Sequence, residues 1–97
     1  MEKIQYEPFI AFCKTNLNRE LDTIANRAKF KLTSVQRDRL EWIAIQQNHR
    51  HYLTQKWIKR YIDYFNQTNS YCVADYNRNI HGNEASYTLA LFKLYLG

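Results

Sequence analysis

The sequence predicts an all-α fold, a single small bundle of about four to five helices that forms one domain over residues 1–97. Two glycines and one proline leave little of the turn-forming material that a sheet needs every few residues. Apolar residues recur at spacings of three and four in several segments, which is the period of a helix. Apolar residues make up 45% of the chain, enough for one core, whereas 97 residues are too few for a second.

The first helix is expected to run from about Pro8 to about Lys29, through PFIAFCKTNLNRELDTIANRAKF. Pro8 suits the first turn, where its missing N–H does no harm. The predicted buried stripe has helical spacing and consists of Phe9, Phe12, Cys13, Leu17, Leu21, Ile24 and Ala28. The Cys13 thiol is therefore expected in the core.

A second helix is expected after KLTS, capped by Thr33 or Ser34, with Gln36 completing a capping box after Thr33. Its buried stripe would contain Val35, Leu40, Ile43 and Ala44. Trp42 and Ile45 widen this apolar arc and are expected to be exposed to a partner. Residues 48–53 are either a turn or a continuation of the second helix.

A third helix is expected after Thr54, its cap, with Trp57, Ile58 and Phe65 in the core. Its opposite face carries Lys56, Lys59, Arg60 and Asp63. Residues 66–70 read as a polar linker, and a short helix is expected in residues 70–79. After a loop with Gly82 as its pivot, Asn83 would cap a last helix, EASYTLALFKLYL, which is apolar almost all round and is therefore expected to be central or to pack against a second molecule.

The positive charge lies in the middle of the chain. The net charge is +5, but residues 27–60 hold nine Lys and Arg against Asp38 and Glu41 alone, a balance of +7, while both flanks are slightly acidic. Such a field attracts polyanions, although a solvated surface that keeps the protein soluble is the alternative. The residues predicted to contact nucleic-acid phosphates are Lys56, Lys59 and Arg60, assisted by Arg37, Arg39 and Arg50.

His49 and His51 could extend this track, and Tyr52 could stack on a base or sugar. Phosphate contacts give salt-sensitive affinity without sequence readout. The second and third predicted helices are not joined by a short glycine-bearing turn, so a helix-turn-helix regulator is disfavoured.

Catalysis is not expected, because the chain has no phosphate-binding glycine loop, no paired-carboxylate arrangement and no cofactor motif. His49, His51, His81, Cys13 and Cys72 lack the spacing of a metal site. The start of the chain has no secretion signal, and no apolar run is long enough to span a bilayer. The protein is therefore expected to be cytoplasmic, with two free thiols.

Two short phrases resemble the small subunit of CRISPR effector complexes. They are L-T-x-x-Q-x-x-x-L, formed by Leu32, Thr33, Gln36 and Leu40, and the tail formed by Phe92, Tyr95 and Gly97. The resemblance implies a non-catalytic helical bundle that acts in antiviral defence. Its partners would be the guide RNA with its target DNA or RNA, other subunits of the ribonucleoprotein complex, and copies of itself. The alternative is a phage or plasmid protein-interaction module, such as an inhibitor, with a protein partner.

Overall fold

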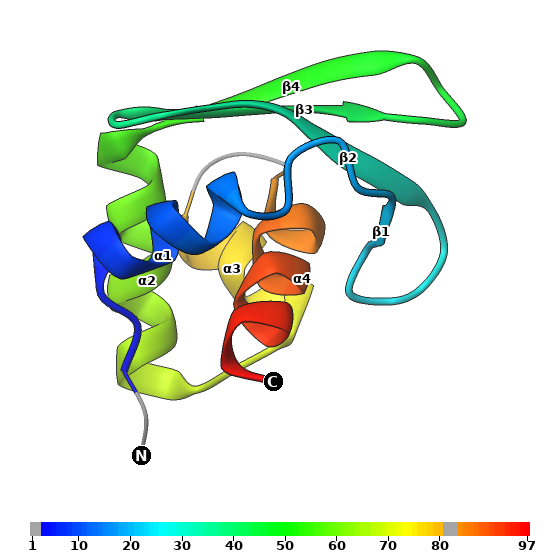
Figure 1. Ribbon diagram of the computed structural model, residues 1–97. Helices are drawn as coiled ribbons and strands as arrows, with labels where there is room; N and C mark the ends of the chain where they lie inside the picture. The colour runs from blue at the N-terminus through cyan, green and yellow to red at the C-terminus, as the bar shows by residue number, and fades with distance from the viewer. Residues whose placement is uncertain (1–2, 81–83) are drawn as a thin grey trace.

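The fold combines helices with an antiparallel sheet, so the prediction of an all-α bundle is wrong. The computed structural model describes residues 3–80 and 84–97. Within these residues the four strands form one sheet in the order β1-β2-β3-β4, and the helices lie together on one side of it (Figure 1). The elements are α1 (Tyr6–Lys14), β1 (Leu21–Asp22), β2 (Lys29–Gln36), β3 (Arg39–Ala44), β4 (His49–Thr54), α2 (Gln55–Thr68), α3 (Val73–Asn79) and α4 (Ala85–Leu96).

The expected second helix is instead the end of β2 and the strand β3, because its apolar residues alternate. Leu40, Trp42 and Ala44 on β3 are buried, and the residues between them are half-exposed, which is the period of a strand with one covered face. Trp42 is 1% exposed, so the expectation that it faces a partner is wrong. Leu40 and Ala44 lie four residues apart, a spacing that also fits a helix, and this coincidence produced the error.

A bulge at Thr33 keeps β2 in register with the core. Leu32 pairs with Trp42, but Ser34 pairs with Glu41, so Thr33 has no partner in β3. Phe30 and Leu32 face the helices before the bulge, and without the extra residue the side chain of Val35 would point to the opposite face. Val35 instead pairs with Leu40 and packs against the core.

Asparagines take the place of the missing glycines at turns. Asn18, Asn26, Asn48 and Asn69 all have φ between 54° and 63°, the left-handed conformation that asparagine tolerates better than most residues. Asn18 and Asn26 flank β1, Asn48 ends the β3–β4 turn, and Asn69 caps the end of α2. The first helix therefore ends at Lys14 and not near Lys29, and the shortage of glycine does not exclude a sheet.

Asn48→Gly is expected to leave the free energy of unfolding almost unchanged, whereas Asn48→Ala is expected to lower it by about 1–2 kcal/mol. The reason is that a β-carbon without a hydrogen-bonding side chain makes the left-handed conformation costly, while glycine adopts it freely. Urea unfolding of both variants measures the difference. Equal stability of the two variants would contradict a left-handed residue at this position.

Two predicted helices are present close to their expected bounds. Thr54 is the N-cap residue of α2, and Ile58 and Phe65 are buried as predicted. Trp57 is only half-buried and packs against the core from outside it, so its assignment to the core is only partly right. A short helix, α3, is also present where expected, but residues 66–68 of the predicted linker belong to α2. The predicted loop pivot at Gly82 and cap at Asn83 lie outside the described residues.

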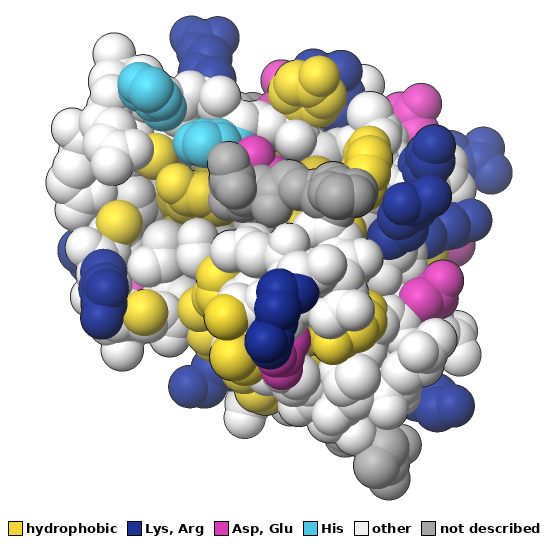
Figure 2. Space-filling model, turned by 180° about the vertical axis from the view of Figure 1, so that it is seen from behind, with side chains coloured by type: hydrophobic (Ala, Val, Ile, Leu, Met, Phe, Trp, Pro, Cys, Tyr) yellow, Lys and Arg dark blue, Asp and Glu magenta, His cyan; other side chains and the backbone are white. Residues whose placement is uncertain are grey.

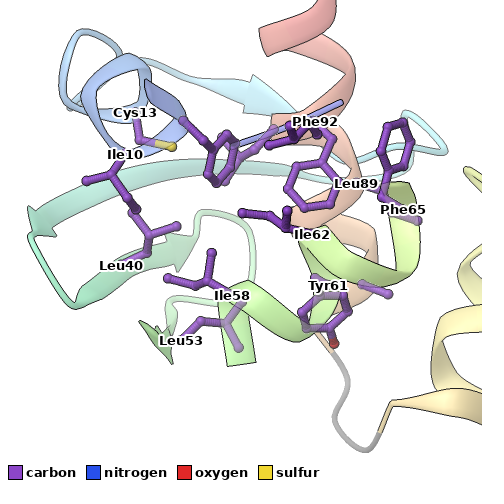
Figure 3. Packing of buried hydrophobic residues seen from close by; sticks show 14 of the residues in the cluster. Ile10, Cys13, Leu40, Leu53, Ile58, Tyr61, Ile62, Phe65, Leu89 and Phe92 are labelled. Carbon is purple, nitrogen blue, oxygen red and sulfur yellow. The ribbon is translucent and has the colours of Figure 1, made fainter. Parts of the chain in front are cut away.

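The last helix is central, which explains its apolar surface. Phe92 of α4 meets the ring of Phe9 from α1 at 5.2 Å and that of Phe65 from α2 at 5.4 Å between centroids. Leu89 is fully buried beside them. Figure 3 shows α1, α2 and the sheet directing their apolar side chains toward this helix. Packing within the chain accounts for most of the apolar surface of α4.

Stability is expected to fall above about pH 9. Burial raises the pKa of the Cys13 thiol from 9.0 and that of the Tyr61 hydroxyl from 10.0, each to about 12, and the nearby Glu84 carboxylate adds to the rise at Tyr61. The unfolded chain releases these protons first as the pH rises, so their contribution is complete below pH 9 and is lost toward pH 12. Urea unfolding at pH 8 and pH 11 tests this, and Cys13→Ala should show a smaller loss. Equal stability at both pH values would contradict the protonated burial of both groups.

Candidate nucleic-acid interface

The face of the sheet opposite the helices is open in the described part of the chain (Figure 1). Residues paired across antiparallel strands project to the same face, so the register places its side chains in rows. Lys31, Ile43 and Arg50 form one row, and Ser34, Glu41 and Tyr52 form the next. In the first row, Lys31 and Arg50 lie on either side of Ile43. The second row ends at the aromatic ring of Tyr52.

Some of the charges on this face neutralise each other. Lys29 Nζ lies 3.2 Å from Asp22 Oδ1, and Arg39 Nε lies 2.6 Å from Glu41 Oε2. Within residues 3–80 and 84–97, Lys31 and Arg50 form no ion pair. The free positive charge of the open face therefore lies on Lys31 and Arg50.

Tyr52 is the most prominent aromatic side chain of the open face. It is 56% exposed, and the guanidinium carbon of Arg39 lies 4.1 Å from the centroid of its ring. The Glu41 carboxylate holds the same guanidinium. The Arg39 side chain thus supports the ring and has its charge balanced by a neighbour.

The three predicted cations of α2 are exposed and lie against aromatic rings, not carboxylates. Arg60 Cζ is 4.9 Å and Lys56 Nζ 5.9 Å from the ring of Trp57, while Lys59 Nζ is 5.3 Å from the ring of Tyr6. None of the three cations has an ion-pair partner among the residues that the structure describes. A cation over a ring keeps its full charge available to an anion.

A depression connects α2 with the open face. It has a volume of about 380 Å³, and its lining includes Arg50 and Tyr52 from β4, Trp57 from α2, and Glu84. The chain passes from β4 into α2 without a loop. In Figure 2, Lys and Arg side chains gather along the flank that contains α2 and the adjacent end of the sheet. We call the surface made by Lys31, Arg37, Arg50, Tyr52, Lys56, Trp57, Lys59 and Arg60 the basic band.

The predicted site residues do not form a track along one helix. Arg37 and Arg39 lie at the end of the sheet next to the cations of α2, whereas Arg50 lies toward the other end, in the row of Lys31. Residues 49–54 are a strand, so neither alternative for this segment, a turn or a continued helix, is right, and His49 and His51 do not extend the cations of α2 along a helix. Arg37 lies in the β2–β3 turn, where its carbonyl oxygen accepts a hydrogen bond from the Tyr6 hydroxyl at 2.9 Å. Gln55 N–H donates to the carbonyl of the next residue, Asp38, at 2.8 Å. The turn is thereby fixed beside the first turn of α2.

Sequence reasoning missed Lys31 as a member of the site and did not foresee the ring contacts. The alternation of polar and apolar residues in KFKL and in RLEWIA is the signal that could have placed Lys31, Arg39 and Glu41 on one open face. The contacts of Tyr6 and Trp57 with the cations of α2 depend on tertiary packing and have no short-range signal.

His51 lies under the sheet and outside the basic band. Its ring is stacked on Trp42 at 5.9 Å and meets Tyr87 at 5.0 Å, and its Nδ1 lies 3.1 Å from Glu84 Oε2. Its Nε2 and the Trp42 Nε1 are buried and have no hydrogen-bond partner among the described residues. The His51 side chain is 22% exposed, and the residue borders the depression that Arg50, Tyr52 and Trp57 line.

The described residues contain neither a candidate metal site nor a helix that could span a membrane. No group of three or more His, Cys, Asp or Glu side chains in residues 3–80 and 84–97 is placed to hold a metal ion, and His81 lies outside these ranges. In the same ranges, every helix is too short or too polar to cross a bilayer. Cys13 is buried, Cys72 is exposed, and both are free.

No protein-family model, curated protein or solved structure matches this chain. The structure can be compared with the helical bundle that the resemblance to CRISPR small subunits implied. Leu32 and Leu40 lie on β2 and β3, joined by a turn, and not in the first turns of a helix. Phe92 and Tyr95 do lie on the last helix, before Gly97. The helical bundle that the resemblance implied is therefore not the fold of this chain.

Proposed function

We propose that this protein is a non-catalytic nucleic-acid-binding protein that contacts the phosphate backbone through the basic band. One observation carries the proposal: the described structure contains no ion pair for any Lys or Arg of the band, although carboxylates neutralise neighbouring cations. Unpaired cations on the open face of the sheet and on the adjoining helix attract a polyanion and can contact its phosphates.

The environment of the titratable groups supports a binding role without catalysis. The His51 imidazole is held between Trp42, Tyr87 and Glu84 at the edge of the depression, and its Nε2 is buried. Burial raises the pKa of the Cys13 thiol to about 12, which suppresses the thiolate that a nucleophile requires. We place the function in the cytoplasm, because free thiols are typical of a reducing compartment.

The assignment to a CRISPR ribonucleoprotein, with copies of the chain stacked along a guide RNA, rests on the two sequence phrases alone. Because the sheet replaces the helical bundle that these phrases implied, we propose nucleic-acid binding without naming a complex. Other subunits or copies of the chain are compatible with this role, but no described feature of the surface favours them.

A binding titration tests the proposal. Labelled single-stranded RNA, single-stranded DNA, duplex DNA and an RNA–DNA hybrid are titrated with the purified protein at two salt concentrations. We expect at least one of them to bind at low salt, with an affinity that falls linearly with salt on logarithmic axes. Absence of binding at low salt, or binding that salt leaves unchanged, would contradict the proposal and favour the protein-interaction module, to be sought by pull-down.

A further inference from the structure

We infer that the ligand of the basic band is a single strand whose unpaired bases stack on Tyr52 and Trp57. This inference rests on the proposed function, because it specifies the form of nucleic acid that the same surface binds. Proteins that take single strands combine a cationic path for the backbone with aromatic rings on which bases stack. The basic band contains both components.

Tyr52 is built as a stacking platform. Glu41 of β3 pairs with Tyr52 of β4, and its carboxylate accepts a hydrogen bond from the Arg39 guanidinium. The guanidinium carbon of Arg39 lies 4.1 Å from the centroid of the Tyr52 ring. More than half of the Tyr52 side chain is still exposed. A ring that is supported from one side has lost conformational freedom before the ligand arrives, which lowers the entropy cost of binding.

Trp57 offers a second ring at the other side of the depression. It lines the same 380 Å³ space as Tyr52 and Arg50, and free cations, Lys56 and Arg60, lie at its ring. Each ring therefore has an unpaired cation close by, Arg50 near Tyr52 and Arg60 near Trp57. A strand crossing the depression would meet ring and cation on both sides of it.

A duplex would contact the cations of the basic band but would not stack on its aromatic rings. Its bases are stacked and paired inside the helix, so a flat exposed ring meets phosphate and sugar but no base face. The cations alone would bind a duplex, whereas the rings add affinity only for unpaired bases.

The test compares three oligomers of equal length: a single strand, the same sugar–phosphate strand without bases, and a blunt duplex. Tyr52→Leu removes the ring, Tyr52→Phe keeps it, and Tyr71→Leu is the matched control, since Tyr71 is an exposed tyrosine outside the basic band, beside Phe65. Base stacking contributes about 1–3 kcal/mol per base. Tyr52→Leu is therefore expected to weaken single-strand binding by about 5- to 150-fold.

The same substitution should leave binding of the base-free strand and of the duplex unchanged, and Tyr52→Phe and Tyr71→Leu should bind like the parent protein. Trp57→Phe should abolish most of the quenching of tryptophan fluorescence by the single strand, because Trp42 is buried. If the duplex and the base-free strand bind as tightly as the single strand and Tyr52→Leu has no effect, the inference is wrong and the proposed function stands. If no oligomer binds, both are wrong.

Discussion

Reversing Lys56, Lys59 and Arg60 to glutamate in one variant is expected to weaken nucleic-acid binding by about a hundredfold or more. Each cation is exposed and free of a carboxylate partner in the described structure, so its charge is available to a phosphate. A charge-assisted hydrogen bond is worth about 1.5–3 kcal/mol, and about 1.4 kcal/mol corresponds to tenfold in affinity. Fluorescence anisotropy with a labelled single strand measures the change.

The matched control reverses Lys3, Lys14 and Lys93, which are exposed and lie outside the basic band. It changes the net charge by the same amount, so a general charge effect would weaken binding equally in both variants. We expect the control to lose only a small fraction of the affinity. Equal losses in the two variants would show that net charge, and not the basic band, determines binding.

Trp42→Ala is expected to lower the free energy of unfolding by about 3–5 kcal/mol, the range for removing a large aromatic side chain from a core. Trp42 is 1% exposed, lies on a central strand, and contacts His51 and Tyr87 with ring centroids 5.9 Å and 5.5 Å away. Alanine would leave a cavity between the sheet and α4. Such a loss is a large part of the stability of a domain of this size.

Trp57→Ala is the comparison for this prediction. The sequence alone placed Trp57 in the core, but the ring is half-buried and lines a surface depression, so its removal should cost about 1–2 kcal/mol. Urea unfolding of the two variants ranks the two costs. A larger loss for Trp57→Ala than for Trp42→Ala would contradict the placement of both indoles.

The elements that the sequence predicted well are those with a long, uninterrupted helical period. In α2, Ile58, Ile62 and Phe65 repeat at four and three residues over several turns, and Thr54 precedes them as a cap. In α4, Leu89 and Phe92 behave likewise. Helical spacing alone was not sufficient, because it also ran from Phe9 to Ala28, where the helix ends at Lys14 and β1 follows.

The strands were missed for two physical reasons. Strand β3 has only six residues, too few to separate alternation from helical spacing when Leu40 and Ala44 are both apolar. Its turn to β4 uses Asn48 with φ of 54° where a glycine was sought. The abundance of asparagine was therefore the turn signal that a count of glycine and proline overlooked.

The sequence alone predicted that the candidate site is positively charged. It did not predict which of its cations lack an ion-pair partner in the described structure. Arg39 and Glu41 are two residues apart, which places them on opposite sides of a helix but on one face of a strand. Because residues 39–44 are a strand, the pair forms an ion pair and Arg39 supports Tyr52. Only the secondary structure shows that Lys31, and not Arg39, contributes an unpaired cation to the open face of the sheet.

The salt dependence of single-strand binding tests the central proposal most directly. The logarithm of the binding constant is measured against the logarithm of salt concentration for the parent protein and for the Lys56, Lys59 and Arg60 reversal. Each phosphate contact contributes about 0.7 to the slope for a single strand. Three lost contacts should therefore make the slope shallower by about 2. Parallel lines for the two proteins, or no binding by the parent protein at low salt, would contradict a phosphate-binding role for the basic band.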